Sequence, residues 1–236
     1  FLPRPRFGEY DAIAEIARQS RFHLSQSDTL QLTSFDGELP NPGVYLRPSD
    51  ELTKPLPPYV RFFVDKRPVG LCIAHGDLNP RNLLIDGIGN IHLIDFPQMR
   101  RERARFLDFV RLEAEIKFKL AELSSSSLAA FLALESLLVE ASSERQLERL
   151  KLLPSEPHAE KVLYAVAALR RTAYRICEPK IDDQKLDAEY KLGLLAQTLR
   201  IALFGDYLSQ DQREFAVLSS SLLIHRLEGY YSHWED

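Results

Sequence analysis

The sequence predicts an α+β protein that is mainly helical. Three observations predict this class: prolines crowd the first third of the chain, short β-type segments begin at Gly70, and helical periodicity fills the chain past Phe96. The 236 residues are 45% hydrophobic and 27% charged, which is typical of a globular protein and not of a disordered one. A chain of this length can bury a stable core, and its two cysteines are too few for a disulfide framework.

Residues 1–69 are expected to form a Pro-rich, looped segment with one helix, leading into a second unit at 70–236. Apolar residues recur at helical spacing between Tyr10 and Ala17, which predicts the helix. Pro, Gly, Asn and Asp punctuate the stretch 36–59, so we expect a long irregular connection there.

The second unit opens with a predicted strand, LCIAH at 71–75, and a hairpin built from NLLID and IHLIDF around a GIGN turn. Six helices are expected after it, over residues 107–120, 128–140, 144–152, 158–177, 184–204 and 210–230. Ser209 and Gln212 form a capping box before the last of these helices.

Charge and hydropathy exclude several classes of protein. Thirty Lys and Arg against thirty-four Asp and Glu give a net charge of −4, which argues against a nucleic-acid-binding protein. The longest apolar runs are far shorter than the roughly 20 residues that a membrane span requires, and the first ten residues lack a secretory signal. We therefore expect a cytoplasmic protein. The chain opens at Phe1 and its only methionine is Met99, so we also expect it to be part of a longer protein.

The stretch that carries chemistry is HGDLNPRN at 75–82, of the form H-x-D-x-x-x-x-N, followed by the hairpin ending in Asp95-Phe96. If Gly87–Asn90 is a four-residue loop, Asn82 lies opposite Asp95. Directly opposed side chains have Cβ atoms about 4.5–5.5 Å apart, so this amide oxygen and carboxylate can share a hard cation such as Mg²⁺. Asp77, at the far side of a Pro-containing turn, can place a second carboxylate nearby without ligating the metal.

This arrangement resembles the catalytic loop and metal strand of protein-kinase-like phosphotransferases, and most closely the aminoglycoside and choline phosphotransferase branch. The resemblance implies a kinase-like C-terminal lobe, with the catalytic loop and metal strand at 72–96, about six or seven helices in all, and a helical remainder at 107–230. It implies Mg²⁺ and ATP as cofactors. Asp77 would be the catalytic base for an acceptor hydroxyl, and Asn82 and Asp95 would hold the metal.

Two further residues take roles from the same resemblance: His75 and Asp108 would support the catalytic loop. Asn79 and Arg81 depart from the commoner signature, which has His and Gly there; we expect them to offer a phosphate or substrate contact, with a plain surface position as the alternative for Arg81. LPNPGVYL at 39–46 and LDFVRLEAEIKFKL at 107–120 are also similar to kinase-like domains of large multidomain bacterial signalling and conflict proteins, the ternary complex associated domains.

The sequence departs from the kinase pattern in its first part. No glycine-rich loop precedes the motif, and Lys54 and Lys66 lie too close to His75 to belong to a separate lobe. Pro97 replaces the glycine of Asp-Phe-Gly. We therefore expect the N-terminal lobe to be absent from this chain and to be supplied upstream or by a partner protein.

Three functions remain open. The first is an ATP-dependent phosphotransferase acting on a hydroxyl of a small molecule or protein. The second is a pseudokinase or protein-interaction module within a larger bacterial signalling or defence protein. The third is a metal-dependent hydrolase that uses the same carboxylates.

Charged residues outside the motif have simpler interpretations. A solvated segment, or else an anion or partner contact, is expected for Arg100, Arg101, Arg103 and Arg105. A helix N-terminus rich in acids, or else a surface that attracts a cationic substrate, is expected for Asp182, Asp183, Asp187 and Glu189. An exposed helix face is expected for Arg170, Arg171 and Arg175.

Overall fold

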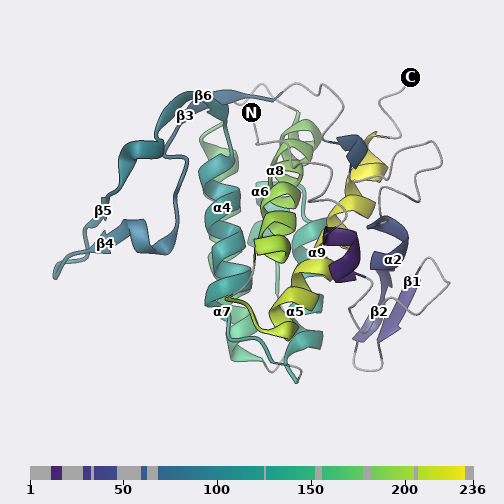
Figure 1. The fold of residues 1–236 in the computed structure, drawn as a ribbon. Coiled ribbons are helices and arrows are strands. Elements are labelled where there is room, and N and C mark those ends of the chain that lie inside the picture. Colours follow the sequence, from purple (N-terminus) through teal and green to yellow (C-terminus); the bar gives the residue numbers. More distant parts are fainter. Residues whose placement is uncertain are drawn as a thin grey trace.

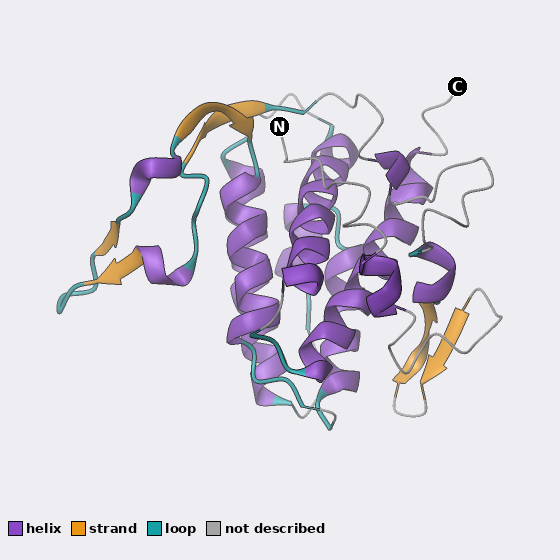
Figure 2. Cartoon of the chain, in the orientation of Figure 1, coloured by secondary structure: helices purple, strands orange, loops and turns teal. Residues whose placement is uncertain are grey.

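The structure is a computed structural model, which describes residues 12–17, 29–32, 35–46, 60–62, 69–124, 126–151, 156–177, 182–204 and 207–231. Over these residues the protein is mainly helical, with three small two-stranded antiparallel sheets (Figure 2). The predicted α+β, mainly helical class is therefore confirmed. None of the described helices combines the length and apolar character needed to cross a membrane.

The helices from residue 107 onward form a bundle. Their bounds are α4 Leu107–Glu115, continued by the π-helical turn η4 Ile116–Leu120, α5 Leu128–Glu140, α6 Glu144–Glu148, α7 Pro157–Arg175, α8 Asp183–Phe204 and α9 Gln210–Tyr231. All six predicted helices are present. Helix α6 is shorter than predicted, because its last turn closes with a bond from the Arg149 amide to the Gln146 carbonyl. The capping box is confirmed: the Ser209 amide donates to Gln212 Oε1 at 2.9 Å, and the Gln212 amide donates to Ser209 Oγ at 3.2 Å.

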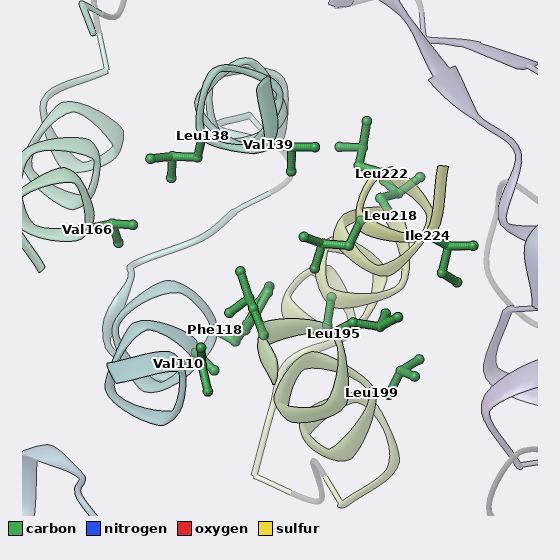
Figure 3. Packing of buried hydrophobic residues seen from close by; sticks show 14 of the residues in the cluster. Val110, Phe118, Leu138, Val139, Val166, Leu195, Leu199, Leu218, Leu222 and Ile224 are labelled. Carbon is green, nitrogen blue, oxygen red and sulfur yellow. The ribbon is translucent and has the colours of Figure 1, made fainter. Parts of the chain in front are cut away.

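The core lies between these helices. Helix α8 packs against α9 and α4, and α5 packs against α9 and α7. Figure 3 shows side chains from four of these elements, Val110, Phe118, Leu195 and Leu218, converging on one apolar interior. The π-helical turn places Phe118 against Phe215, with ring centroids 5.3 Å apart. This closely packed interior supplies the hydrophobic part of the bundle's stability.

The first described strands of the chain pack on the side of the bundle opposite residues 71–104 (Figure 1). Strands β1 Thr29–Leu32 and β2 Phe35–Pro40 form a hairpin, and the short helix α2 Pro42–Tyr45 follows it. Both lie against α9 (Figure 1). The prediction of an irregular connection over 36–59 is thus wrong at its beginning, because the buried Asn41 caps α2 by accepting from the Gly43 amide at 2.9 Å. The rest of that stretch, 47–59, lies outside the described residues. Residues 12–17 are helical, as predicted.

A β-structured arm, residues 71–104, projects away from the bundle (Figure 1). At its base, β3 Leu71–Ala74 pairs with β6 Arg100–Ala104; at its tip, β4 Leu83–Ile85 pairs with β5 Ile91–Leu93. The short 3₁₀ turns η2 Pro80–Asn82 and η3 Phe96–Gln98 connect base and tip. The sequence predicted β3 and the tip hairpin. It missed β6, which we had interpreted as a solvated, arginine-rich segment.

The register of the tip hairpin differs from the prediction by one residue. Leu83 pairs with Leu93, so Asn82 lies opposite Ile94, whose amide donates to the Asn82 carbonyl at 3.1 Å. The reason is the turn. Asp86 accepts from the amides of Ile88 and Asn90 through Oδ1 and from the Asn90 side chain through Oδ2, which makes Asp86 and Asn90 the closing pair. These bonds, led by that of the Asn90 backbone, lower the pKa of Asp86 to about 2.

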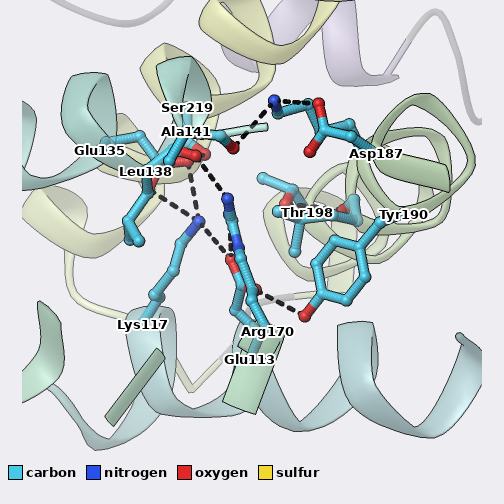
Figure 4. A network of polar contacts seen from close by, with 12 residues as sticks. Glu113, Lys117, Glu135, Leu138, Ala141, Arg170, Asp187, Tyr190, Thr198 and Ser219 are labelled. Carbon is cyan, nitrogen blue, oxygen red and sulfur yellow. Dashed lines mark hydrogen bonds and ion pairs between the residues drawn. The ribbon is translucent and has the colours of Figure 1, made fainter. Parts of the chain in front are cut away.

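Charged side chains are buried inside the bundle, against prediction in two places (Figure 4). Arg170, expected on an exposed face, is fully buried and forms two hydrogen bonds with the Glu113 carboxylate, at 2.8 and 2.7 Å. Asp187, expected at the surface, is buried and accepts from Lys191 at 2.5 Å. Helical periodicity cannot distinguish a solvated arginine from a buried, paired one, since both occupy single polar positions.

Candidate functional site

The loop after β3 is attached to the bundle through Asp108, in the first turn of α4. One carboxylate oxygen of Asp108 accepts from the His75 amide at 2.6 Å, and the other accepts from the Gly76 amide at 2.8 Å. His75 is buried; its Nε2 donates to the Ile94 carbonyl at 2.8 Å, and its ring lies 5.0 Å from that of Phe96. His75 and Asp108 therefore join the loop to both the hairpin and the bundle.

Gly76 allows the loop to turn at this point. Its φ is +81°, a conformation that side chains with a Cβ rarely adopt, and a Cβ added here would lie 2.7 Å from the Gln98 carbonyl oxygen. The turn sets the direction in which the next residue, Asp77, leaves the loop.

Two asparagines bind the backbone of Asp77. The side-chain amides of Asn79 and Asn82 each donate to the Asp77 carbonyl at 2.9 Å. Asn79 also accepts from the Arg81 amide and so caps the 3₁₀ turn η2, in which Arg81 is exposed. Because the Asn82 amide group is used as a donor, its Oδ1 is directed elsewhere and forms no hydrogen bond with the described residues.

Ile94, and not Asp95, lies opposite Asn82, so the direct opposition predicted for the two metal ligands is wrong; Asp95 is the next residue along the chain. Its backbone is left-handed, with φ 64° and ψ 61°, a conformation that Asp adopts more readily than most side chains. The carboxylate makes no capping bond in η3. An amide oxygen and a carboxylate for which the described residues supply no hydrogen-bond donor are a donor set that fits Mg²⁺.

No group of three or more His, Cys, Asp or Glu side chains within the described ranges is placed to hold a metal ion. A nucleotide-bound Mg²⁺ differs from such a site, because one or two protein ligands suffice when phosphates supply the others. Asn82 and Asp95 match that smaller set. The metal-binding and catalytic roles of these residues stay predictions.

The Asp77 side chain has a partner that the sequence did not reveal. The Arg111 guanidinium forms an ion pair with Asp77 Oδ1 and donates to the Gly76 carbonyl at 3.3 Å. Arg111 lies one helical turn after Asp108 on α4, so one face of this helix contacts the loop through both residues. The i, i+3 spacing of Asp108 and Arg111 on the predicted helix is the signal in the sequence that indicates this contact.

Arg111 also lines a cavity of about 210 Å³ between α4 and α8. Its other lining residues are Glu115, Lys119, Gln197, Arg200, Ile201, Tyr207 and Leu208. Burial lowers the pKa of Arg111, the charge of Asp77 raises it, and the nearby charge of Arg200 lowers it again. The described structure thus brings the proposed base Asp77 next to a pocket lined by several basic side chains.

Comparisons with known proteins bear on the family of this chain. A family model, ternary complex associated domain 9, matches residues 14–200. No curated protein and no solved structure matches the chain. The similarity to ternary complex associated domains is therefore confirmed, whereas the aminoglycoside phosphotransferase resemblance has no such support. Because the match covers most of the sequence, including the loop, the arm and α4, this chain belongs to the ternary complex associated domain 9 family.

Proposed function

We propose that the chain is a kinase-like module that binds Mg·ATP and transfers a phosphoryl group to a hydroxyl. The observation that carries this proposal is the ordered loop. Asp108 holds its backbone at His75 and Gly76, and Asn82 holds it at Asp77. Asp77, Asn82 and Asp95 carry carboxylate and amide oxygens on this same segment, and phosphoryl transfer requires such groups to be held in place in advance.

Each residue has a distinct part in this proposal. Asn82 and Asp95 would hold Mg²⁺, which when bound neutralises charge on the nucleotide phosphates. Asp77 orients the acceptor hydroxyl and accepts its proton at the carboxylate. Arg111 pairs with that carboxylate and holds it in position until the hydroxyl arrives.

Protein partners are part of the proposal, since the family is named for association in ternary complexes. The arm exposes many large apolar side chains, of which Ile85, Ile88 and Ile91 are 71, 86 and 66% exposed. Large apolar side chains exposed together on one hairpin are typical of interaction sites. We propose that another protein with an apolar face covers the tip hairpin and closes the nucleotide site from the side opposite the bundle.

The alternative function is a pseudokinase that uses the arm only for docking. The ion pair between Arg111 and Asp77 favours it, because the carboxylate of the proposed base is already occupied. In that case the loop bonds would serve the fold alone. A hydrolase would use the same carboxylates and turn over its substrate without ATP.

Isothermal titration of the whole chain with Mg·ATP tests these functions. Asp95→Asn should weaken binding by at least tenfold, since it removes a charged ligand, whereas Asp77→Asn should leave binding within about twofold and abolish transfer. Identical affinities for the native chain and Asp95→Asn would contradict the nucleotide site. Equal loss of binding in both variants would show that Asp77 is structural.

A further inference from the structure

The cavity beside Asp77 has a composition that selects one class of ligand. Three basic residues line it, Arg111 from α4, Lys119 from η4 and Arg200 from α8, against one acidic residue, Glu115. Its volume of about 210 Å³ is below the roughly 300–1,000 Å³ of sites that enclose a whole drug-sized molecule. The cavity therefore fits a charged group on a ligand better than an entire large ligand.

Of the three basic side chains that line the cavity, two are paired with carboxylates and one forms no ion pair with the described residues. Lys119 donates to Glu115 at 2.6 Å, and Arg111 is paired with Asp77. Arg200 forms no ion pair with the described residues, yet its charge lies near enough to Arg111 to lower the pKa of that guanidinium. Two guanidiniums that repel each other across a small cavity are a favourable place for an anion.

The polar residues of the cavity suit an oxyanion. Guanidinium groups bind phosphate and carboxylate with two parallel hydrogen bonds, and the buried amide of Gln197 adds a donor. Tyr207, which lies just before α9, also lines the cavity. A dianionic phosphate would use both guanidiniums, while a carboxylate would need only one.

Arg111 connects this cavity to the proposed chemistry. The same guanidinium contacts the Asp77 carboxylate, the Gly76 carbonyl and the cavity. Only the Arg111 side chain therefore separates an anion held by Arg111 and Arg200 from the Asp77 carboxylate, the group that would receive the acceptor's proton.

We infer that the cavity binds the phosphate group of the acceptor, which is a small alcohol carrying a phosphate monoester. This inference rests on the proposed function, whose acceptor it specifies. It also reverses the expectation of a cationic substrate, since Asp187, one of the acids predicted to attract it, is buried and paired with Lys191.

Inorganic phosphate is the probe, titrated into the whole chain at constant ionic strength and observed by NMR at the arginine Nε–H groups. Saturable shifts should appear at Arg111 and Arg200. Arg200→Gln should weaken phosphate binding at least tenfold, whereas Arg145→Gln, at an exposed arginine on α6, should not change it. Since Arg200 is exposed, the variant should keep the amide spectrum of the folded protein. Unsaturable shifts, or equal affinity in the native chain and Arg200→Gln, would overturn the inference.

Two further arms separate this inference from the proposed function and from the nucleotide's own phosphates. Asp95→Asn should keep phosphate binding while losing Mg·ATP binding, so that a failure of the phosphate site and a failure of the nucleotide site are observed separately. Mg·ATP added to the phosphate-loaded native chain should leave the Arg200 signal in its bound position. Displacement of phosphate by the nucleotide would assign the cavity to ATP and overturn the acceptor assignment.

Discussion

The bundle and the arm differ in the kind of side chain that each buries and exposes. Inside the bundle, charged groups are fully buried and paired: Glu113 accepts from Arg170, Lys117 and Tyr190, and Glu135 accepts from Lys117 and Ser219 (Figure 4). On the arm, large apolar side chains face outward, and Ile88 at the tip is 86% exposed. The bundle thus pairs its buried charged groups internally, whereas the arm leaves apolar side chains exposed.

The proposed site lies where these two regions meet. The loop with the kinase-like residues lies at the junction of the two regions, and α4 extends into it with Asp108 and Arg111. A rigid bundle holds one side of the loop in place. The other side of the loop depends on the arm. The protein proposed to cover the arm would then control whether the site is complete.

The largest effect is expected from breaking the bundle's charge network. Glu113→Ala leaves Arg170 buried without its carboxylate, and removing one partner of a buried ion pair costs about 3–5 kcal/mol. Urea denaturation followed by circular dichroism measures this loss. The matched control is Glu144→Ala, which removes a solvent-exposed pair with Arg175 and should cost less than about 1 kcal/mol. Equal losses in the two variants would mean that the buried ion pair stabilises the fold no more than the exposed one does.

The same network predicts a dependence of stability on pH. Burial alone would raise the pKa of Glu113, but the charges of Arg170 and Lys117 outweigh it and lower the pKa to about 2 from the ordinary 4.5. The ionised carboxylate therefore stabilises the fold above about pH 4.5, and this contribution, on the order of 3 kcal/mol, is lost as the pH falls toward 2.

Comparison with Glu113→Gln isolates that contribution. The difference in unfolding free energy between the native chain and the variant should shrink steadily between pH 5 and pH 2.5 in urea titrations. A difference that stays constant over this range would show that Glu113 does not titrate with a lowered pKa.

The sequence predicted the elements better than their contacts. Periodicity and capping residues located all six helices of the bundle, because local patterns determine where helices begin and end. The sequence pattern missed β6, since the arginines of this segment hide the strand that pairs with β3. The predicted hairpin register was wrong by one residue, since the Asp86 side chain closes the turn with Asn90 and not with Ile91. Arg170 and Arg111 were missed for one reason: whether an arginine is paired depends on residues distant in sequence.

A smaller and local effect is expected at the junction. Asp108→Ala removes the acceptor for the His75 and Gly76 amides, so each loses a charge-assisted bond worth about 1.5–3 kcal/mol in a well-formed case. Amide hydrogen exchange should accelerate at these two residues by at least tenfold, while exchange in the core of α8 and α9 changes little. Uniform acceleration across the bundle would instead make Asp108 a global stability residue.

The smallest effect on stability is expected at the tip of the arm. Ile85 and Ile91 pair across β4 and β5, and both side chains are mostly exposed, so the double variant Ile85→Ser, Ile91→Ser should change the unfolding free energy by less than about 0.5 kcal/mol. The matched control is Leu195→Ala in the core, where a cavity costs about 2–5 kcal/mol. Urea denaturation of both variants gives the comparison. A loss at the tip as large as that at Leu195 would mean that these isoleucines are covered in the free protein, and the arm would then be packed by this chain itself and not held open for a partner.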